Sequence, residues 1–277
     1  LPKDLHKNVL VVGSLAAAYH YRKQLQTQAV NTKDADVVVK PAGALDECRK
    51  MAMRLLEENW RRHPQKCFPQ QNPDPIDNLR AIRLFPPKSY AYYLELLGLP
   101  ETNQSEMKKW VPVWLDDGWY GLPCFRYFAV TDHEPKCSDE GLHYAAPGMM
   151  VLANLLAHPK IGQDTMSEPI GGRTLLRAAK DLGRVLALAW LAGGEGVEQW
   201  VEPWNSALKK HYPNDHEKLA KHLGDGLRAL LNDEEALDQA RHANEVGLLR
   251  GKGVNVAMLR AVGEQVLSFA VEPLLGS

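Results

Sequence analysis

The architecture of this chain is predicted by two short apolar runs, VLVVGS at residues 9–14 and DADVVV at residues 34–39. The first run is short and mostly β-branched, which is typical of a buried strand. Gly13 permits a sharp turn, and Ser14 suits a helix N-cap ahead of the helix-favouring alanines at residues 16–18. Because a helix start offers unpaired backbone N–H groups to an anion, we expect a phosphate-binding turn at Gly13 and Ser14.

The second run predicts a strand with two carboxylates on one face. Asp34 and Asp36 are two residues apart, and side chains at that spacing point to the same side of a strand. Two adjacent carboxylates repel each other unless a cation lies between them, and Mg²⁺ commonly takes one or two carboxylates together with substrate phosphates. The alternative is that Asp34 ends a polar turn and Asp36 is a solvated strand residue.

The order Val12-Gly13-Ser14, a helix, and then Asp34-Ala35-Asp36-Val37 resembles the signature of the polymerase-β-like nucleotidyltransferase superfamily. This resemblance implies a third carboxylate on a later strand, and Glu95 lies in such an apolar setting between Tyr92 and Leu97. It further implies a metal site of Asp34, Asp36 and Glu95 that uses Mg²⁺ or Mn²⁺. The implied reaction transfers a nucleoside monophosphate from a nucleoside triphosphate to a hydroxyl of RNA, protein or a small molecule, and releases pyrophosphate.

Residues 145–157 and 177–186 resemble the helical segment of bacterial members of that superfamily, those named after abortive-infection toxins and related antitoxin or resistance enzymes. The resemblance implies that Lys180 contacts a phosphate, with a surface ion pair as the alternative. Lys33 takes the place of an arginine that many relatives carry before the aspartates. The loop at residues 31–33 and the use of Glu95 leave a second function open: a catalytically weak binding or antitoxin-like regulatory protein with the same fold.

Length and composition favour a cytoplasmic protein of two domains. The chain has 277 residues, and a domain typically has about 100 to 200, so we expect a catalytic domain at residues 1–144 and a helical bundle at 145–277. The net charge of −1 argues against a wholly basic nucleic-acid coat, although a local patch remains open. The 4 cysteines form no C-x-x-C pattern, and the chain has no long apolar run of the kind that spans a membrane. Neither the nucleotide, the acceptor nor the oligomeric state is predicted.

The remaining pattern predicts an α+β fold, a small mixed sheet with covering helices followed by an all-helical region. The expected elements are a helix at 45–60, antiparallel strands at 79–85 and 89–97, a hairpin turning at Asp117-Gly118, a strand at 124–130 and helices from 145 onwards. His20 and Arg22 could point to phosphates, but an exposed helix face is the simpler reading. A zinc site of His133, Cys137 and His143 lacks a fourth ligand at metal-like spacing.

Overall fold

The computed structural model describes residues 1, 3–25, 32–41, 43–64, 70–76, 79–102 and 104–275. The chain forms two compact units, which contain Leu1–Ala16 with Thr32–Ala146 and Ala17–Asn31 with Pro147–Ser277. The polypeptide therefore passes from one unit to the other three times, after residues 16, 31 and 146. That residues 1–144 and 145–277 act as separate functional domains remains a prediction.

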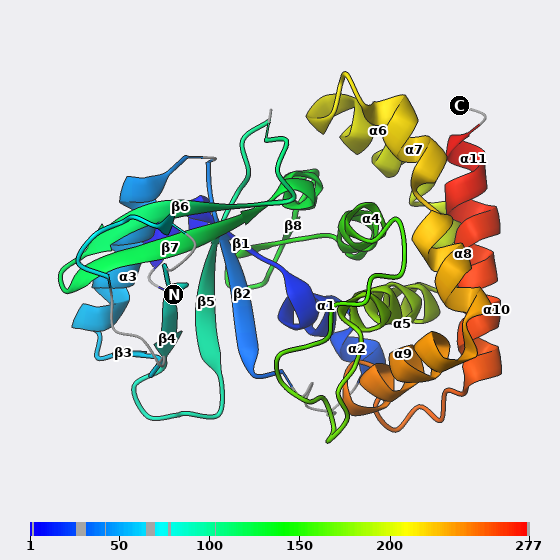
Figure 1. The fold of residues 1–277 in the computed structure, drawn as a ribbon, viewed down its shortest axis with the longest axis horizontal. Helices are drawn as coiled ribbons and strands as arrows, with labels where there is room; N and C mark the ends of the chain where they lie inside the picture. The colour runs from blue at the N-terminus through cyan, green and yellow to red at the C-terminus, as the bar shows by residue number, and fades with distance from the viewer. Residues whose placement is uncertain are drawn as a thin grey trace. The chain divides into compact units, whose positions relative to one another are not determined.

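The first unit is built on a mixed sheet, which has nine strands in the described part of the chain (Figure 1). The strands are β1 (Val9–Val11), β2 (Asp34–Val39), β3 (Arg61–Arg62), β4 (Arg83–Phe85), β5 (Tyr93–Gly98), β6 (Lys108–Leu115), β7 (Gly118–Phe125), β8 (Lys136–Cys137) and β9 (His143–Tyr144). Their order is β3-β4-β5-β2-β1-β9-β8, and the β6–β7 hairpin joins β5 through β7. The centre of the sheet places β2 antiparallel to β1 and parallel to β5. The short helix η1 (Lys3–Asn8) precedes β1.

Helix α3 (Leu45–Glu57), which corresponds to the helix predicted at 45–60, covers one face of this sheet. Its buried side chains join a core with Val37 and Val39 of β2 and with Leu94 and Leu96 of β5. Because side chains alternate along a strand, the residues between them point to the opposite face. Asp34 and Asp36 therefore lie on the sheet face that α3 does not cover.

Two local predictions in the first unit need correction. Leu115 pairs with Gly118, so the hairpin turns at Asp116-Asp117 and not at Asp117-Gly118. The predicted strand at 124–130 is wrong beyond Phe125, where the chain enters the 3-10 helix η3 (Arg126–Asp132). The Thr131 hydroxyl donates to the Phe128 carbonyl at 2.6 Å and helps to close that turn. The predicted antiparallel pairing of residues 79–85 with 89–97 is confirmed, within β4 and β5.

The regular elements of the second unit are all helices in its described residues, which together with the mixed sheet confirms the predicted α+β fold class. Its helices after residue 146 are α4 (Pro147–Ala157), α5 (Arg177–Glu198), α6 (Val201–His211), α7 (His216–His222), α8 (Asp225–Asn232), α9 (Glu234–Val246), α10 (Val256–Val266), the π-helical η4 (Leu267–Val271) and α11 (Glu272–Leu274). Helix α1 (Gly13–His20) begins in the first unit and continues into the second, where α2 (Arg22–Leu25) follows.

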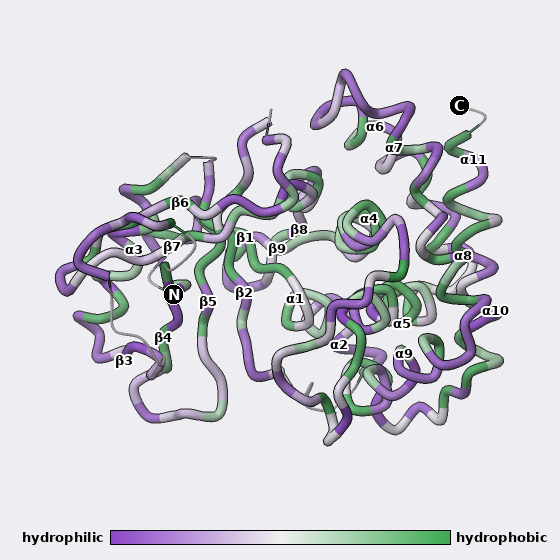
Figure 2. Tube along the Cα trace, viewed as in Figure 1, coloured by the Kyte–Doolittle hydropathy of each residue, from purple (hydrophilic) through white to green (hydrophobic). Residues whose placement is uncertain are grey.

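Burial of apolar helix faces holds the second unit together. Helix α4 carries a nearly continuous run of apolar residues (Figure 2). Most of them are buried. Trp204 is fully buried and donates its indole N–H to the Gly148 carbonyl at 2.8 Å, and its ring stacks on Trp200. These two tryptophans are therefore core residues. No helix in the described ranges is long and apolar enough to cross a membrane.

Candidate functional site

The turn between β1 and α1 brings the backbone of Gly13 against the carboxylate of Asp36. The Val12 N–H donates to the Asp36 carbonyl at 3.0 Å, which fixes the start of the turn on β2. Gly13 has a φ of +72°, and a Cβ at this position would lie 2.7 Å from Asp36 Oδ2. Both the backbone conformation and the space therefore require glycine. Helix α1 spans Gly13–His20, so Ser14 lies at its start, and the N-cap role of Ser14 remains a prediction.

The two aspartates of β2 share one sheet face, as their spacing predicts. Both are half-buried, and Asp34 Oδ1 accepts a hydrogen bond from the Thr32 hydroxyl at 2.8 Å. Asp36 carries the additional contact with Gly13. The pair thus combines partial desolvation with a fixed backbone, and both features help a carboxylate pair to hold a cation.

Glu95 joins the same face through the register of the sheet. Asp36 of β2 pairs with Glu95 of β5, and Glu95 in turn pairs with Arg83 of β4. Arg83 Nε donates to Glu95 Oε2 at 2.8 Å, and the Glu95 side chain is only 13% exposed. The third acid is therefore beside the aspartates, but its charge is compensated by an arginine.

The Tyr93 side chain lies among these charged groups. Neither Tyr93 nor Arg83 was predicted from the sequence as a site residue. Burial raises the pKa of the Tyr93 phenol to about 12, with Asp34, Glu95 and Asp36 adding to the rise and Arg83 opposing it. All three carboxylates therefore act on one ring. The available signal was alternation: Tyr93 lies two residues before Glu95 and so faces the same side of β5.

The residues present fit a divalent cation through two carboxylates. Within the described residues, no three side chains of His, Cys, Asp or Glu are grouped so that they could hold a metal ion. This applies to the acids on the sheet and to His133, Cys137 and His143 alike. Mg²⁺ nevertheless needs only one or two carboxylates when substrate phosphates supply further oxygens, so Asp34 and Asp36 match its preference. The participation of Glu95 as a third ligand remains a prediction.

The two predicted phosphate-binding lysines lie in different surroundings. Lys33 is exposed directly before β2, and its carbonyl accepts the Tyr93 N–H at 2.9 Å. Lys180 lies on α5 in the second unit, where its Nζ is 3.7 Å from Asp181 Oδ1. The ion pair that was the alternative for Lys180 is thus present, and phosphate contacts by either lysine remain predictions. Asn31, the first residue of the predicted loop, lies outside the described residues.

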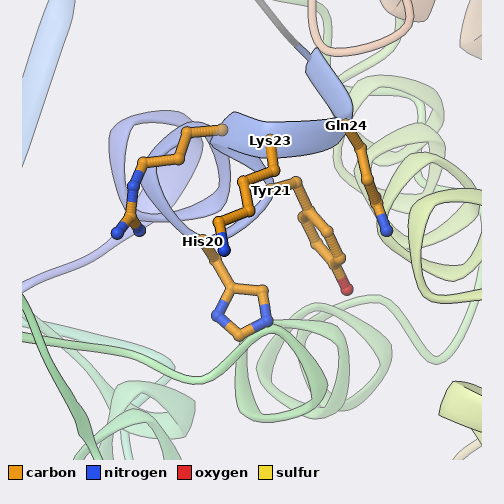
Figure 3. A pocket seen from close by; sticks show the side chains of 5 residues that line it. His20, Tyr21, Lys23 and Gln24 are labelled. Atoms are coloured by element: carbon orange, nitrogen blue, oxygen red, sulfur yellow. The ribbon is translucent and has the colours of Figure 1, made fainter.

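A separate cavity of about 360 Å³ in the second unit is lined by residues 20–24 (Figure 3). The His20 ring packs edge-on against Tyr21, with 4.8 Å between ring centroids. Tyr21 is buried, whereas Arg22 and Lys23 are exposed, which agrees with a polar helix face. The Arg22 guanidinium lies over the Tyr19 ring, 4.3 Å from its centroid. Nothing in the geometry of this cavity selects a ligand.

No protein-family model matches the chain, and no curated protein matches it. Among solved structures, the chain matches the structure of the Bradyrhizobium diazoefficiens CD-NTase CdnG in complex with GTP. The two have 13% sequence identity, and the match covers 95% of this chain and 84% of that chain with a TM-score of 0.22. A TM-score this low does not establish a common fold.

Proposed function

We propose that the protein is a metal-dependent nucleotidyltransferase that uses a nucleoside triphosphate and a hydroxyl acceptor. The observation that supports this proposal is the placement of the half-buried Asp34 and Asp36 on the sheet face that α3 does not cover, with the Gly13 backbone against Asp36. A carboxylate pair next to a glycine turn and a helix start offers a cation site and an anion site side by side. A metal-bound triphosphate needs both, because its cation binds carboxylates and its phosphates accept backbone N–H groups.

The roles follow from the chemistry of each group. Asp34 and Asp36 hold Mg²⁺ or Mn²⁺, which when bound neutralises phosphate charge in the transition state. The N–H groups at the start of α1, from Gly13 and Ser14, receive triphosphate oxygens, and Lys33 adds a positive charge at the entrance to β2. The acceptor oxygen forms a bond to the α-phosphorus, while the bond to the bridging oxygen breaks and pyrophosphate leaves with that electron pair. Glu95 takes the acceptor proton.

Isothermal titration with Mg²⁺ and each nucleoside triphosphate tests the metal site. Asp34→Asn and Asp36→Asn should each remove most of the Mg²⁺-dependent nucleotide binding, because each loses one negative oxygen ligand. Both variants should fold, since removal of one charge relieves carboxylate repulsion. Asp46→Asn on α3 is the matched control: the same exchange at an exposed residue outside the site. Unchanged nucleotide affinity in both site variants would refute the assignment.

A second function is favoured by the ion pair between Arg83 and Glu95. An arginine that neutralises the third acid would suit a nucleotide-binding protein with weak or lost chemistry, such as an antitoxin-like regulator. The two functions differ in one measurement, because only the enzyme releases pyrophosphate after it binds the metal and nucleotide. Glu95→Gln should abolish this release and only weaken nucleotide binding. Normal release in that variant would rule out a catalytic role for Glu95.

A further inference from the structure

Aromatic and basic side chains continue the acidic face of the sheet to its β3 edge. In the register of the sheet, Arg61 pairs with Phe85 just as Arg83 pairs with Glu95. Partners in an antiparallel pair point to the same side, so Arg61 and Phe85 lie on the face that carries Asp36. We define the aromatic strip as this edge region, made of Arg61, His63, Phe85, Tyr90 and Tyr93.

The rings of the aromatic strip contact one another. The His63 ring stacks on Phe85 at 4.8 Å between centroids, and Tyr93 meets His63 edge-on at the same distance. Tyr90 packs edge-on against Phe85 at 5.1 Å and is 65% exposed. Phe85, in contrast, is buried. The exposed Tyr90 ring is therefore held in place by the buried Phe85 ring.

Guanidinium groups lie against the two tyrosines of the aromatic strip. The Arg61 guanidinium is 3.8 Å from the centroid of the Tyr90 ring, and that of Arg83 is 5.3 Å from the centroid of Tyr93. Arg83 is compensated by Glu95. Among the described residues, Arg61 instead donates to the Tyr90 hydroxyl and to the carbonyls of Pro86 and Ser89. Its positive charge thus remains available to an anion.

We propose that the aromatic strip binds single-stranded nucleic acid, and that the acceptor hydroxyl of the reaction belongs to this strand; this second statement rests on the proposed function. Aromatic faces stack on bases of any sequence, and arginines attract the phosphates between them. From β3 to β2 there are three strand spacings of roughly 4.8 Å, or about 14 Å. That span corresponds to about four stacked nucleotides at roughly 3.4 Å each. A protein or small-molecule acceptor would make no comparable use of an exposed tyrosine ring beside an arginine.

Fluorescence anisotropy with labelled oligonucleotides tests the aromatic strip directly. Single-stranded RNA and DNA oligonucleotides of ten nucleotides are titrated with the full-length protein, without nucleotide and without divalent metal. Tyr90→Ala should weaken binding about tenfold or more, because the exposed stacking face is lost, whereas Tyr90→Phe should stay within about threefold of the wild-type affinity. Arg61→Ala should weaken binding and lower the slope of log K against log salt by about 0.7.

Arg54→Ala is the matched control, because it removes the same charge from α3, which covers the other sheet face. Binding of either nucleic acid with selective loss in the Tyr90 and Arg61 variants supports the proposal. Equal losses in Arg61→Ala and Arg54→Ala, or normal binding by Tyr90→Ala, would overturn it. This experiment uses neither a nucleoside triphosphate nor a divalent metal. Its result therefore does not depend on whether the titrations above detect metal-dependent nucleotide binding.

Discussion

Replacement of Gly13 by alanine tests the central geometry of the site. A φ of +72° is left-handed, and an alanine there costs roughly 1 kcal/mol of folding free energy. The new Cβ would also lie 2.7 Å from Asp36 Oδ2, and such overpacking typically costs about 1 to 3 kcal/mol more. We therefore expect Gly13→Ala to lower the free energy of unfolding by about 2 to 4 kcal/mol and to displace the Asp36 carboxylate.

Gly43 offers a matched control because its φ is +75° and no described atom lies within 4 Å of a Cβ placed there. Gly43→Ala should thus cost only the conformational term of about 1 kcal/mol. The second control is the Asp36→Ala background, in which Oδ2 is absent and the remaining Asp36 Cβ is 3.8 Å away. In that background Gly13→Ala should also cost about 1 kcal/mol, which leaves a coupling energy of about 1 to 3 kcal/mol in the double-mutant cycle.

Urea unfolding of the four proteins of the cycle measures these energies, and titration with Mg²⁺ and nucleoside triphosphate measures the site. Nucleotide affinity should fall in Gly13→Ala and stay unchanged in Gly43→Ala. The reasoning would be refuted by equal destabilisation in the two glycine variants together with a coupling energy near zero. Such a result would mean that Asp36 does not lie on the Gly13 backbone.

Two further predictions concern the second unit. Burial disfavours the charged form of Asp181, but the hydrogen bond from His158 at 3.0 Å and the neighbouring cations outweigh it, so the pKa of Asp181 is lowered. Asp181→Asn should therefore cost about 3 kcal/mol at pH 7, and the loss should shrink as the pH falls below about 3.9, the unfolded value, when monitored by urea unfolding. A Cβ on Gly226 would lie 1.7 Å from the His158 carbonyl oxygen, whereas one on Gly194 meets its nearest atom at 3.6 Å. Gly226→Ala should lower the melting temperature strongly and Gly194→Ala hardly at all; equal melting temperatures would contradict the close packing of α8.

The sequence predicted those parts of the site that depend on local geometry. The shared face of Asp34 and Asp36 follows from the period of two along a strand, which holds wherever the strand is placed. The turn at Gly13 was also predicted, because it depends on the conformational freedom of a single glycine. The positive φ of Gly13 is not helical, so the right-handed helical conformation begins after Gly13, and the N-cap role of Ser14 remains a prediction.

The partners of Glu95 could not be predicted, because they depend on strand register. Antiparallel pairing of β4 and β5 was expected, but the pattern alone does not say that Arg83 lies opposite Glu95. That register depends on the connection between the strands, and a shift of one residue would turn Arg83 to the other face. The change of unit within α1 was missed for a similar reason, since an alanine-rich helix shows no break in pattern where its packing partners change.

The threefold passage of the chain between the units has a consequence for its biosynthesis. Residues 17–25 are synthesised before residues 147–277, which form most of the unit to which they belong. Tyr21 and Leu25 are buried there, and Lys252 donates to the Gln24 carbonyl at 3.0 Å. About 120 residues separate Leu25 from Pro147, which at roughly 5 to 20 residues per second takes about 6 to 24 s. During this time the apolar side chains of the segment lack the residues that bury them in the folded unit. A fragment that ends at residue 146 would never gain those residues.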